Sequence, residues 1–293
     1  MTIALDLQKM INALPPIAWR GFVWPHAGVI EVPGGAFEIS STVRIDSPFV
    51  IIRGQGAVAT QLHFTGKGPA IEWTSRGLNS GIGQTLAGGL RDLSIVGYKA
   101  QPGSFGLVTR DLIGFSSTRV SICGFNQPGS AGWWDDTVLW FNERYDVEME
   151  MGDNQDCWLV TNNHAPGSFN GYTYGYGCLK LWLNCIKGGN AIRSVGKSKD
   201  YPAQVWNESA HIVVNGADGK CFNLNNYSHW HLQGMVHCEQ NPKGLVTDWT
   251  SYLVVNGYST GLYANQFHKV GSNLLQRAKQ AYHKVHKIGA ELY

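Results

Sequence analysis

The sequence predicts an all-β solenoid, a fold in which short strands stack as successive coils. The chain of 293 residues has 36 glycines and only 15% charged residues, which is typical of a β-rich protein with many turns. Short apolar runs recur at residues 90–98, 117–125, 144–152, 178–185, 209–217, 228–236 and 251–259. Leu93, Val120 and Val147 match at intervals of 27 residues, and Trp230 and Leu253 match at 23. A period of about 20 to 30 residues with one strand pattern per repeat indicates coils that share one core.

The N-terminal segment predicts a short amphipathic helix followed by strands. Its apolar residues fall on one face of a 3.6-residue repeat, and two prolines end the pattern: Ile3, Leu7, Met10, Ile11 and Leu14, then Pro15 and Pro16. Residues 29–62 then contain short β-branched runs separated by turn residues such as Pro33-Gly34-Gly35 and Gly54-Gln55-Gly56. We therefore expect a capping helix and sharp corners between strands.

Helical periodicity returns in the last 22 residues. Ser272 is a suitable N-cap, and Lys284 and Lys287 would lie in the final turns. The chain is thus predicted to consist of a solenoid domain, residues 1–271, and an amphipathic helix, residues 272–293. This helix would either cover the last coil or join copies of the chain.

Composition and motifs exclude several classes of protein. A net charge of +2 with no concentrated basic region argues against a nucleic-acid-binding protein. No apolar run is long enough for membrane insertion, and the N-terminus lacks a signal peptide. The six cysteines contain no CxxC pair, so we expect buried free thiols rather than a metal site, and we expect no cofactor.

One region resembles a known family. Residues 1–64 combine the N-terminal helix, a corner at residues 28–35 and a turn with Gly54, Gly56 and Thr60. This arrangement resembles the first coils of the pectate-lyase-like right-handed parallel β-helix superfamily, particularly phage tailspikes and related polysaccharide depolymerases. The resemblance implies a right-handed single-stranded parallel β-helix. As expectations it also implies a bacterial surface polysaccharide as the partner, a homotrimer, and a place in the virion or outside the cell reached without a visible signal peptide.

Aromatic residues next to polar residues are candidates for glycan binding. An aromatic face packs on the C–H surface of a sugar, while neighbouring amides and carboxylates bind its hydroxyl groups. The predicted substrate-binding residues are Trp133, Trp134, Trp140, Trp206, Tyr227 and Trp230.

Hydrolysis of a glycosidic bond requires two carboxyl groups about 5 to 9.5 Å apart, one acting as an acid and one as a base or nucleophile. The predicted catalytic residues are Asp135, Asp136, Glu143, Glu208 and Glu239. Asp135 and Asp136 adjoin two tryptophans that could exclude water, but neighbours on a strand point to opposite faces. If the segment is extended, the catalytic partner of either aspartate must therefore come from another coil or chain.

Several alternatives remain open at the level of sequence. Glu148 and Glu150 would form an outward acidic pair on a strand with Val147, Met149 and Met151 facing inward. His229, His231 and His237, of which the first two would share a strand face, could be metal ligands or outward polar residues. The same fold could act as a polysaccharide lyase with a Lys, Arg or His base, or bind glycans without cutting them. The sequence contains no G-x-S-x-G motif at a predicted strand-to-helix turn, which argues against a serine esterase.

Overall fold

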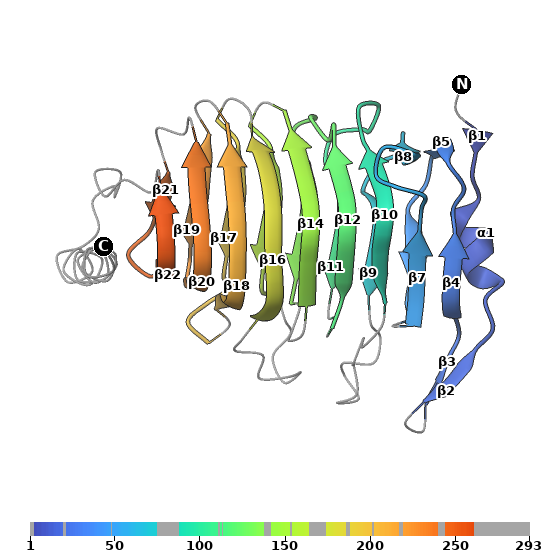
Figure 1. Cartoon of the computed structure of the whole chain (residues 1–293), viewed down its shortest axis with the longest axis horizontal. Helices are drawn as coiled ribbons and strands as arrows, with labels where there is room; N and C mark the ends of the chain where they lie inside the picture. Colours follow the sequence, from blue (N-terminus) through green and yellow to red (C-terminus); the bar gives the residue numbers. More distant parts are fainter. Residues whose placement is uncertain are drawn as a thin grey trace.

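The chain folds as a right-handed parallel β-helix, as predicted. The computed structural model describes residues 3–260 except 20–21, 48, 75–87, 111, 113, 138–141, 153, 164–173, 186–187, 201, 217–218 and 240–243, and it leaves out the side chains of residues 19, 22, 142–143, 174–178, 206, 208 and 260. The strands form a 12-stranded sheet, here the large sheet, and an 8-stranded sheet, here the small sheet. Their coils follow one another in chain order along the long axis of the molecule (Figure 1).

The large sheet contains all seven strands predicted from the repeat. They are β10 (Gly89–Val96), β12 (Ser116–Cys123), β14 (Asn142–Met151), β16 (Tyr174–Cys185), β18 (Ala203–Asn215), β20 (Ser228–Glu239) and β22 (Tyr252–Thr260), each paired in parallel with the next. The register places Leu93 beside Val120, Val120 beside Val147, and Trp230 beside Leu253. The predicted repeat positions are therefore confirmed as direct neighbours.

The small sheet supplies a second strand per coil, where the sequence pattern predicted only one. Its strands are β6 (Val43–Ile45), β9 (Pro69–Thr74), β11 (Phe105–Arg110), β13 (Ala131–Asp136), β15 (Asp156–Thr161), β17 (Asn190–Val195), β19 (Lys220–Asn225) and β21 (Leu245–Thr247). From β10 onward the chain alternates between the two sheets. Side chains pointing inward from both sheets form one core, as a solenoid requires.

The first coils are built differently from the later ones. The strands β4 (Ala27–Glu31), β5 (Gly35–Ile39), β7 (Phe49–Arg53) and β8 (Thr60–Phe64) all belong to the large sheet. The beginning of β10 pairs with β7 and its end pairs with β8. Two short strands separated by a corner thus give way to one longer strand with a bend.

The bend recurs at one position in successive coils. Asp92, Arg119 and Asp146 have φ values of 55°, 51° and 51°, in the left-handed region. At the corresponding part of β20 and β22, Gly234 and Gly257 have φ values of 136° and 141° and lie beside each other. A side chain on Gly257 would place its Cβ 2.1 Å from the carbonyl oxygen of Gly234, so only glycine fits there.

The helix α1 (Leu7–Asn12) covers the N-terminal end of the core, as predicted. It is shorter than the apolar pattern suggested, because Ile3 belongs to a strand and is exposed, and Leu14 follows the helix. Leu7 and Ile11 are buried in the core cluster. The side chain of Gln8 accepts from the backbone N–H of Arg44 and donates to its carbonyl oxygen, and this satisfies the outer edge of β6. Beside the helix lie β1 (Ile3–Ala4), paired with β5, and the antiparallel hairpin β2 (Ile17–Trp19) and β3 (Phe22–Trp24).

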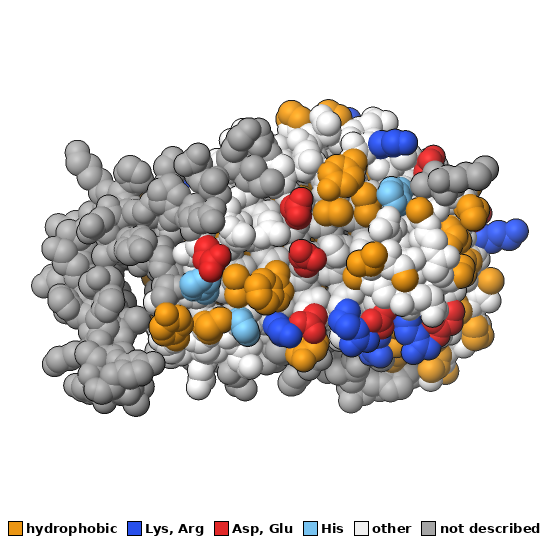
Figure 2. Space-filling view, turned by 45° about the horizontal axis from the view of Figure 1, so that its top comes forward, with side chains coloured by type: hydrophobic (Ala, Val, Ile, Leu, Met, Phe, Trp, Pro, Cys, Tyr) orange, Lys and Arg blue, Asp and Glu red, His pale blue; other side chains and the backbone are white. Residues whose placement is uncertain are grey.

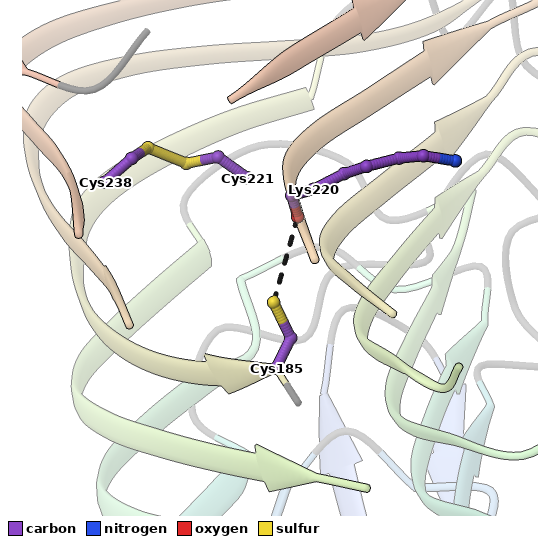
Figure 3. The surroundings of a disulfide bond; sticks show 4 residues. All are labelled: Cys185, Lys220, Cys221 and Cys238. Carbon is purple, nitrogen blue, oxygen red and sulfur yellow. Dashed lines mark hydrogen bonds between the residues drawn. A yellow bond between two sulfur atoms is a disulfide. The ribbon is translucent and has the colours of Figure 1, made fainter. Parts of the chain in front are cut away.

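A disulfide joins the two sheets near the C-terminal end of the described solenoid. Cys221 on β19 is bonded to Cys238 on β20, with 6.3 Å between their Cα atoms (Figure 3). Cys185 lies nearby and its thiol approaches the carbonyl oxygen of Lys220 at 3.9 Å. The expectation of free thiols is therefore wrong for Cys221 and Cys238, because these inward positions on facing strands come within bonding distance. It holds for Cys157 and Cys185, which are free and buried, whereas Cys123 is free and half-buried.

The predicted C-terminal helix, residues 272–293, lies outside the described residues. Within the part of the chain that is described, no helix is both long and apolar enough to cross a membrane.

Candidate functional site

Two rows of side chains run across the outer face of the large sheet. Alternation along β14 buries Val147, Met149 and Met151 and exposes Glu148 and Glu150, as the sequence predicts. The same alternation continues on the next three strands. The resulting surface, here the polar band, consists of Glu148, Glu150, Trp182, Asn184, Asn215, His237 and Glu239, with the half-buried Val213 between Trp182 and His237.

The register sets which members of the polar band are neighbours. Glu148 lies beside Trp182, and Glu150 lies beside Asn184. The second row continues from Asn184 to Asn215 and then to Glu239. Figure 2 shows acidic, histidine and hydrophobic side chains gathered on this side of the molecule. Carboxylates, amides and an aromatic ring therefore share one outer face of the large sheet.

Trp182 is the large aromatic side chain of the polar band. Its residue is 47% exposed although it lies in the middle of a long strand, between the buried Leu181 and Leu183. The ring centroid of His211 on β18 lies 6.3 Å away at an angle of 42°. An exposed indole held on a rigid strand is suited to pack against the apolar face of a sugar ring.

The spacing of the carboxylates distinguishes close pairs from distant ones. Alternate residues on a strand are about 6.6 Å apart, so Glu148 and Glu150 can reach the carboxyl separation of about 6.5–9.5 Å found in inverting glycosidases. Glu239 is three strand positions from Glu150, or about 14 Å. Glu148 and Glu150 are thus close enough to act on one bond, whereas Glu150 and Glu239 are not.

At the far end of the polar band, the side chains of His237 and Glu239 are in hydrogen-bond contact. Their Nε2 and Oε1 atoms are 2.7 Å apart, and the side chains are 31% and 50% exposed. A carboxylate in this position orients the imidazole ring.

Basic residues beside the polar band are paired with acidic residues. Along the bend, Arg119 contacts Asp92 through two hydrogen bonds, and Lys180 contacts Asp146. In the first coils Arg53 binds Glu31, and this hydrogen bond lowers the pKa of the Glu31 carboxyl. Figure 2 shows basic and acidic side chains alternating along this line.

Asp135, a predicted catalytic residue, lies in the core. It is 0% exposed and accepts hydrogen bonds from the Arg144 guanidinium at 3.1 and 3.2 Å and from the Trp158 indole at 2.9 Å. Thr109 donates to it as well. Arg144 itself is 1% exposed and lies over the Trp133 ring at 4.1 Å. In this position Asp135 cannot reach a polymer at the surface, and it neutralises a buried cation.

Asp136 points outward from the small sheet, away from the polar band. Its carboxylate accepts from the Thr161 hydroxyl at 2.8 Å and from the Asn163 backbone N–H at 3.0 Å. Trp134 faces the same way, with the Arg110 guanidinium 4.5 Å above its ring. Because β13 is a strand, Asp135 and Asp136 point to opposite faces, as the sequence argument required.

The remaining predicted residues are scattered. Trp133 and Trp230 are both 0% exposed and pack edge-to-face on Phe115 and Trp158, so they offer no face to a glycan. Tyr227 is half-buried at a corner with φ of 62°. Trp140 lies outside the described residues, and only the backbones of Glu143, Trp206 and Glu208 are described. Of the predicted catalytic residues whose side chains are described, Glu239 alone belongs to the polar band.

His229 and His231 lie on the outer face of the large sheet, next to Tyr252. The rings of His229 and Tyr252 are stacked with centroids 4.5 Å apart, and His231 Nε2 is 3.1 Å from the Tyr252 hydroxyl. Burial lowers the pKa of both imidazoles. Among the described residues, no three His, Cys, Asp or Glu side chains come close enough together to hold a metal ion.

Trp182, Asn184 and Asn215 belong to the polar band but are not among the site residues that the sequence predicts. The signal for Trp182 was present, because an aromatic residue alternating with Leu181 and Leu183 must face outward if the leucines face inward. Asn184 and Asn215 carry no such signal, since asparagine is also typical of strand ends and corners.

Comparisons with known proteins give only distant likenesses. No family model matches the chain, and no curated protein matches it. Among solved structures, ORF18 of Geobacillus virus E2 is similar over 90% of this chain at 11% identity with a TM-score of 0.38, and this chain covers only 56% of that one. The A-module of the Azotobacter vinelandii mannuronan C-5 epimerase AlgE4 is similar over 84% of this chain and 91% of its own length, at 12% identity with a TM-score of 0.31.

Proposed function

We propose that this chain binds a linear bacterial surface polysaccharide along the polar band and hydrolyses it with Glu148 and Glu150. The observation that carries the proposal is the exposed Trp182 indole directly beside Glu148 and next to Glu150 and Asn184. An aromatic platform, a carboxyl pair and amide groups on one rigid face are the parts that glycan binding and cleavage require.

The reaction follows from the positions of the two carboxyl groups. One of them, protonated, gives its proton to the glycosidic oxygen as the bond from that oxygen to the anomeric carbon breaks. The other, ionised, takes a proton from a water molecule whose oxygen attacks the anomeric carbon from the opposite face. The separation of Glu148 and Glu150 favours this inverting route over a covalent intermediate.

Binding is tested by affinity electrophoresis in gels that contain bacterial capsular or lipopolysaccharide glycans. Trp182→Ala should weaken binding about tenfold or more, in line with the loss of one aromatic stacking contact. The matched control is Trp249→Ala, because Trp249 is 62% exposed in a turn outside the polar band. Equal binding by both variants would contradict the proposed surface.

Hydrolysis is tested by the release of new reducing ends. Glu148→Gln and Glu150→Gln should each abolish turnover and retain binding, whereas Asp136→Asn and Glu239→Gln should retain turnover. If Glu148→Gln stayed active while Glu143→Gln or Glu208→Gln lost turnover, the catalytic role would instead be assigned to Glu143 or Glu208.

A lyase is the second candidate, favoured by the contact between His237 and Glu239. Here the imidazole, oriented by Glu239, would remove the proton next to a uronic carboxylate as the glycosidic bond breaks. The product would carry an unsaturated sugar that absorbs ultraviolet light, and its appearance would replace the hydrolase proposal. Retention of a polymer without any cleavage would instead identify a glycan-binding tail component.

Assembly and location belong to the same proposal. We propose a homotrimer that is carried on a phage tail or acts outside the cell. Light scattering on the purified chain should give three times the monomer mass of 32.2 kDa. A monomer at micromolar concentration would contradict the trimer without affecting the glycan site.

A further inference from the structure

The charges of the polar band restrict the kind of glycan that it can hold. The two rows from β12 to β20 contain Glu148, Glu150 and Glu239 as anions. The one titratable base in these rows is His237, which is bound to Glu239. Within the described residues, neither row contains a lysine or an arginine.

The lysine and arginine next to the polar band do not offset its excess of negative charge. Lys180 and Arg119 lie along the bend next to the polar band, and each is in contact with an aspartate from a neighbouring strand. These pairs are neutral as units. A carboxylate, phosphate or sulfate on a sugar placed against Trp182 would therefore meet Glu148 and Glu150, and within the described residues the two rows hold no lysine or arginine to offset the repulsion. The imidazole of His211 lies 6.3 Å from the Trp182 ring, outside these rows.

We propose that the glycan held by the polar band is uncharged, with no anionic group in its repeating unit. The inference rests on the proposed function and names the substrate class of that site. It also disfavours the lyase candidate, because a lyase needs a uronic carboxylate on its substrate. Neutral sugars bind here through the indole face and through hydrogen bonds to carboxylates and amides, and neither contribution depends strongly on salt.

The experiment uses the full chain and pairs of polymers that differ only in charge. Acidic capsular polysaccharides with one uronic acid per repeating unit are compared with their carboxyl-reduced forms by affinity electrophoresis at low salt. The reduced form should bind about tenfold more tightly or better, since each unscreened like-charge contact weakens binding severalfold. Raising the salt concentration should narrow the difference.

A triple variant tests whether the preference for the neutral polymer comes from the carboxylates of the polar band. The triple substitution Glu148→Gln, Glu150→Gln and Glu239→Gln should reduce the preference for the neutral form to about twofold or less. The control Asp200→Asn removes an exposed carboxylate from the turn before β18, far along the strand from the polar band, and should keep the full preference.

The outcomes separate this inference from the proposed function. Equal or tighter binding of the acidic form overturns the neutral-glycan inference and leaves glycan binding intact. A preference that survives the triple substitution also overturns it. Binding of neither form across the polymer panel overturns both.

Discussion

At the scale of single residues, the distinction that matters is between buried and exposed carboxylates. Asp135 and Glu148 are similar in sequence in that each follows an apolar residue on a strand. Asp135 is buried because Arg144, Thr109 and Trp158 supply its hydrogen bonds, whereas Glu148 is exposed. Removing one partner of a buried pair leaves the other charge uncompensated, and this is strongly destabilising.

Asp135→Asn should therefore lower the free energy of unfolding by about 3–5 kcal/mol. The double substitution Asp135→Asn with Arg144→Met should recover part of that loss, because it removes the uncompensated cation as well. Urea unfolding followed by tryptophan fluorescence measures both. If Asp135→Asn unfolds like the wild type but loses turnover, Asp135 is a catalytic residue as first predicted.

Histidines near the last described strand should make stability depend on pH. Burial lowers the pKa of His229 and His231 in the folded state, so below the unfolded value of about 6.5 the unfolded chain binds more protons. Stability is thus fully present above pH 6.5 and is lost as the pH falls through the folded pKa. The double variant His229→Gln with His231→Gln lacks these imidazoles. As the pH falls from 7 to 5, its melting temperature should therefore rise relative to that of the wild type. Parallel melting curves across this range would contradict the assignment.

At the scale of elements, the sequence predicted one sheet well and the other poorly. The strands of the large sheet contain long alternating runs such as that of β14, and their register followed from matching residues. The strands of the small sheet are short and mostly buried on both faces, as in β13, where only Trp134 is half-buried. Without alternation they resemble turns, and the sequence therefore predicts Trp133 and Asp135 as surface residues although both are buried.

The disulfide between β19 and β20 should stabilise the last coils. Closing a loop with a sequence separation of 17 residues contributes about 3 kcal/mol to stability. Cys221→Ser with Cys238→Ser should lower the unfolding free energy by about that amount, measured by denaturant unfolding under non-reducing conditions. Cys123→Ser, which changes a free half-buried thiol, is the control. Equal stability of all three proteins would show that the disulfide contributes nothing.

At the scale of the whole molecule, stability is a sum over neighbouring coils, because each coil contacts chiefly the coils beside it. A destabilising substitution at one end of the solenoid should therefore affect mainly the coils next to it. The sequence could predict this architecture from its repeat and N-terminal helix. It could not predict the polar band, since that surface depends on the register of four strands separated by irregular loops.

Ile11→Ala in α1 should destabilise the N-terminal end by about 2–5 kcal/mol, because Ile11 is fully buried against the first coils. Hydrogen exchange should increase first in β5 and β6 and last in β19 and β21. An equal increase along all coils would indicate that the solenoid unfolds as a single cooperative unit.

The constant register of β10, β12 and β14 also limits how the chain can change in length. A duplication of one 27-residue coil in this region would preserve every inward and outward position and lengthen the solenoid by about 4.8 Å. An insertion of one residue within a strand would turn its core side chains outward. Length variation in this region is therefore confined to whole coils, or to the corners between strands.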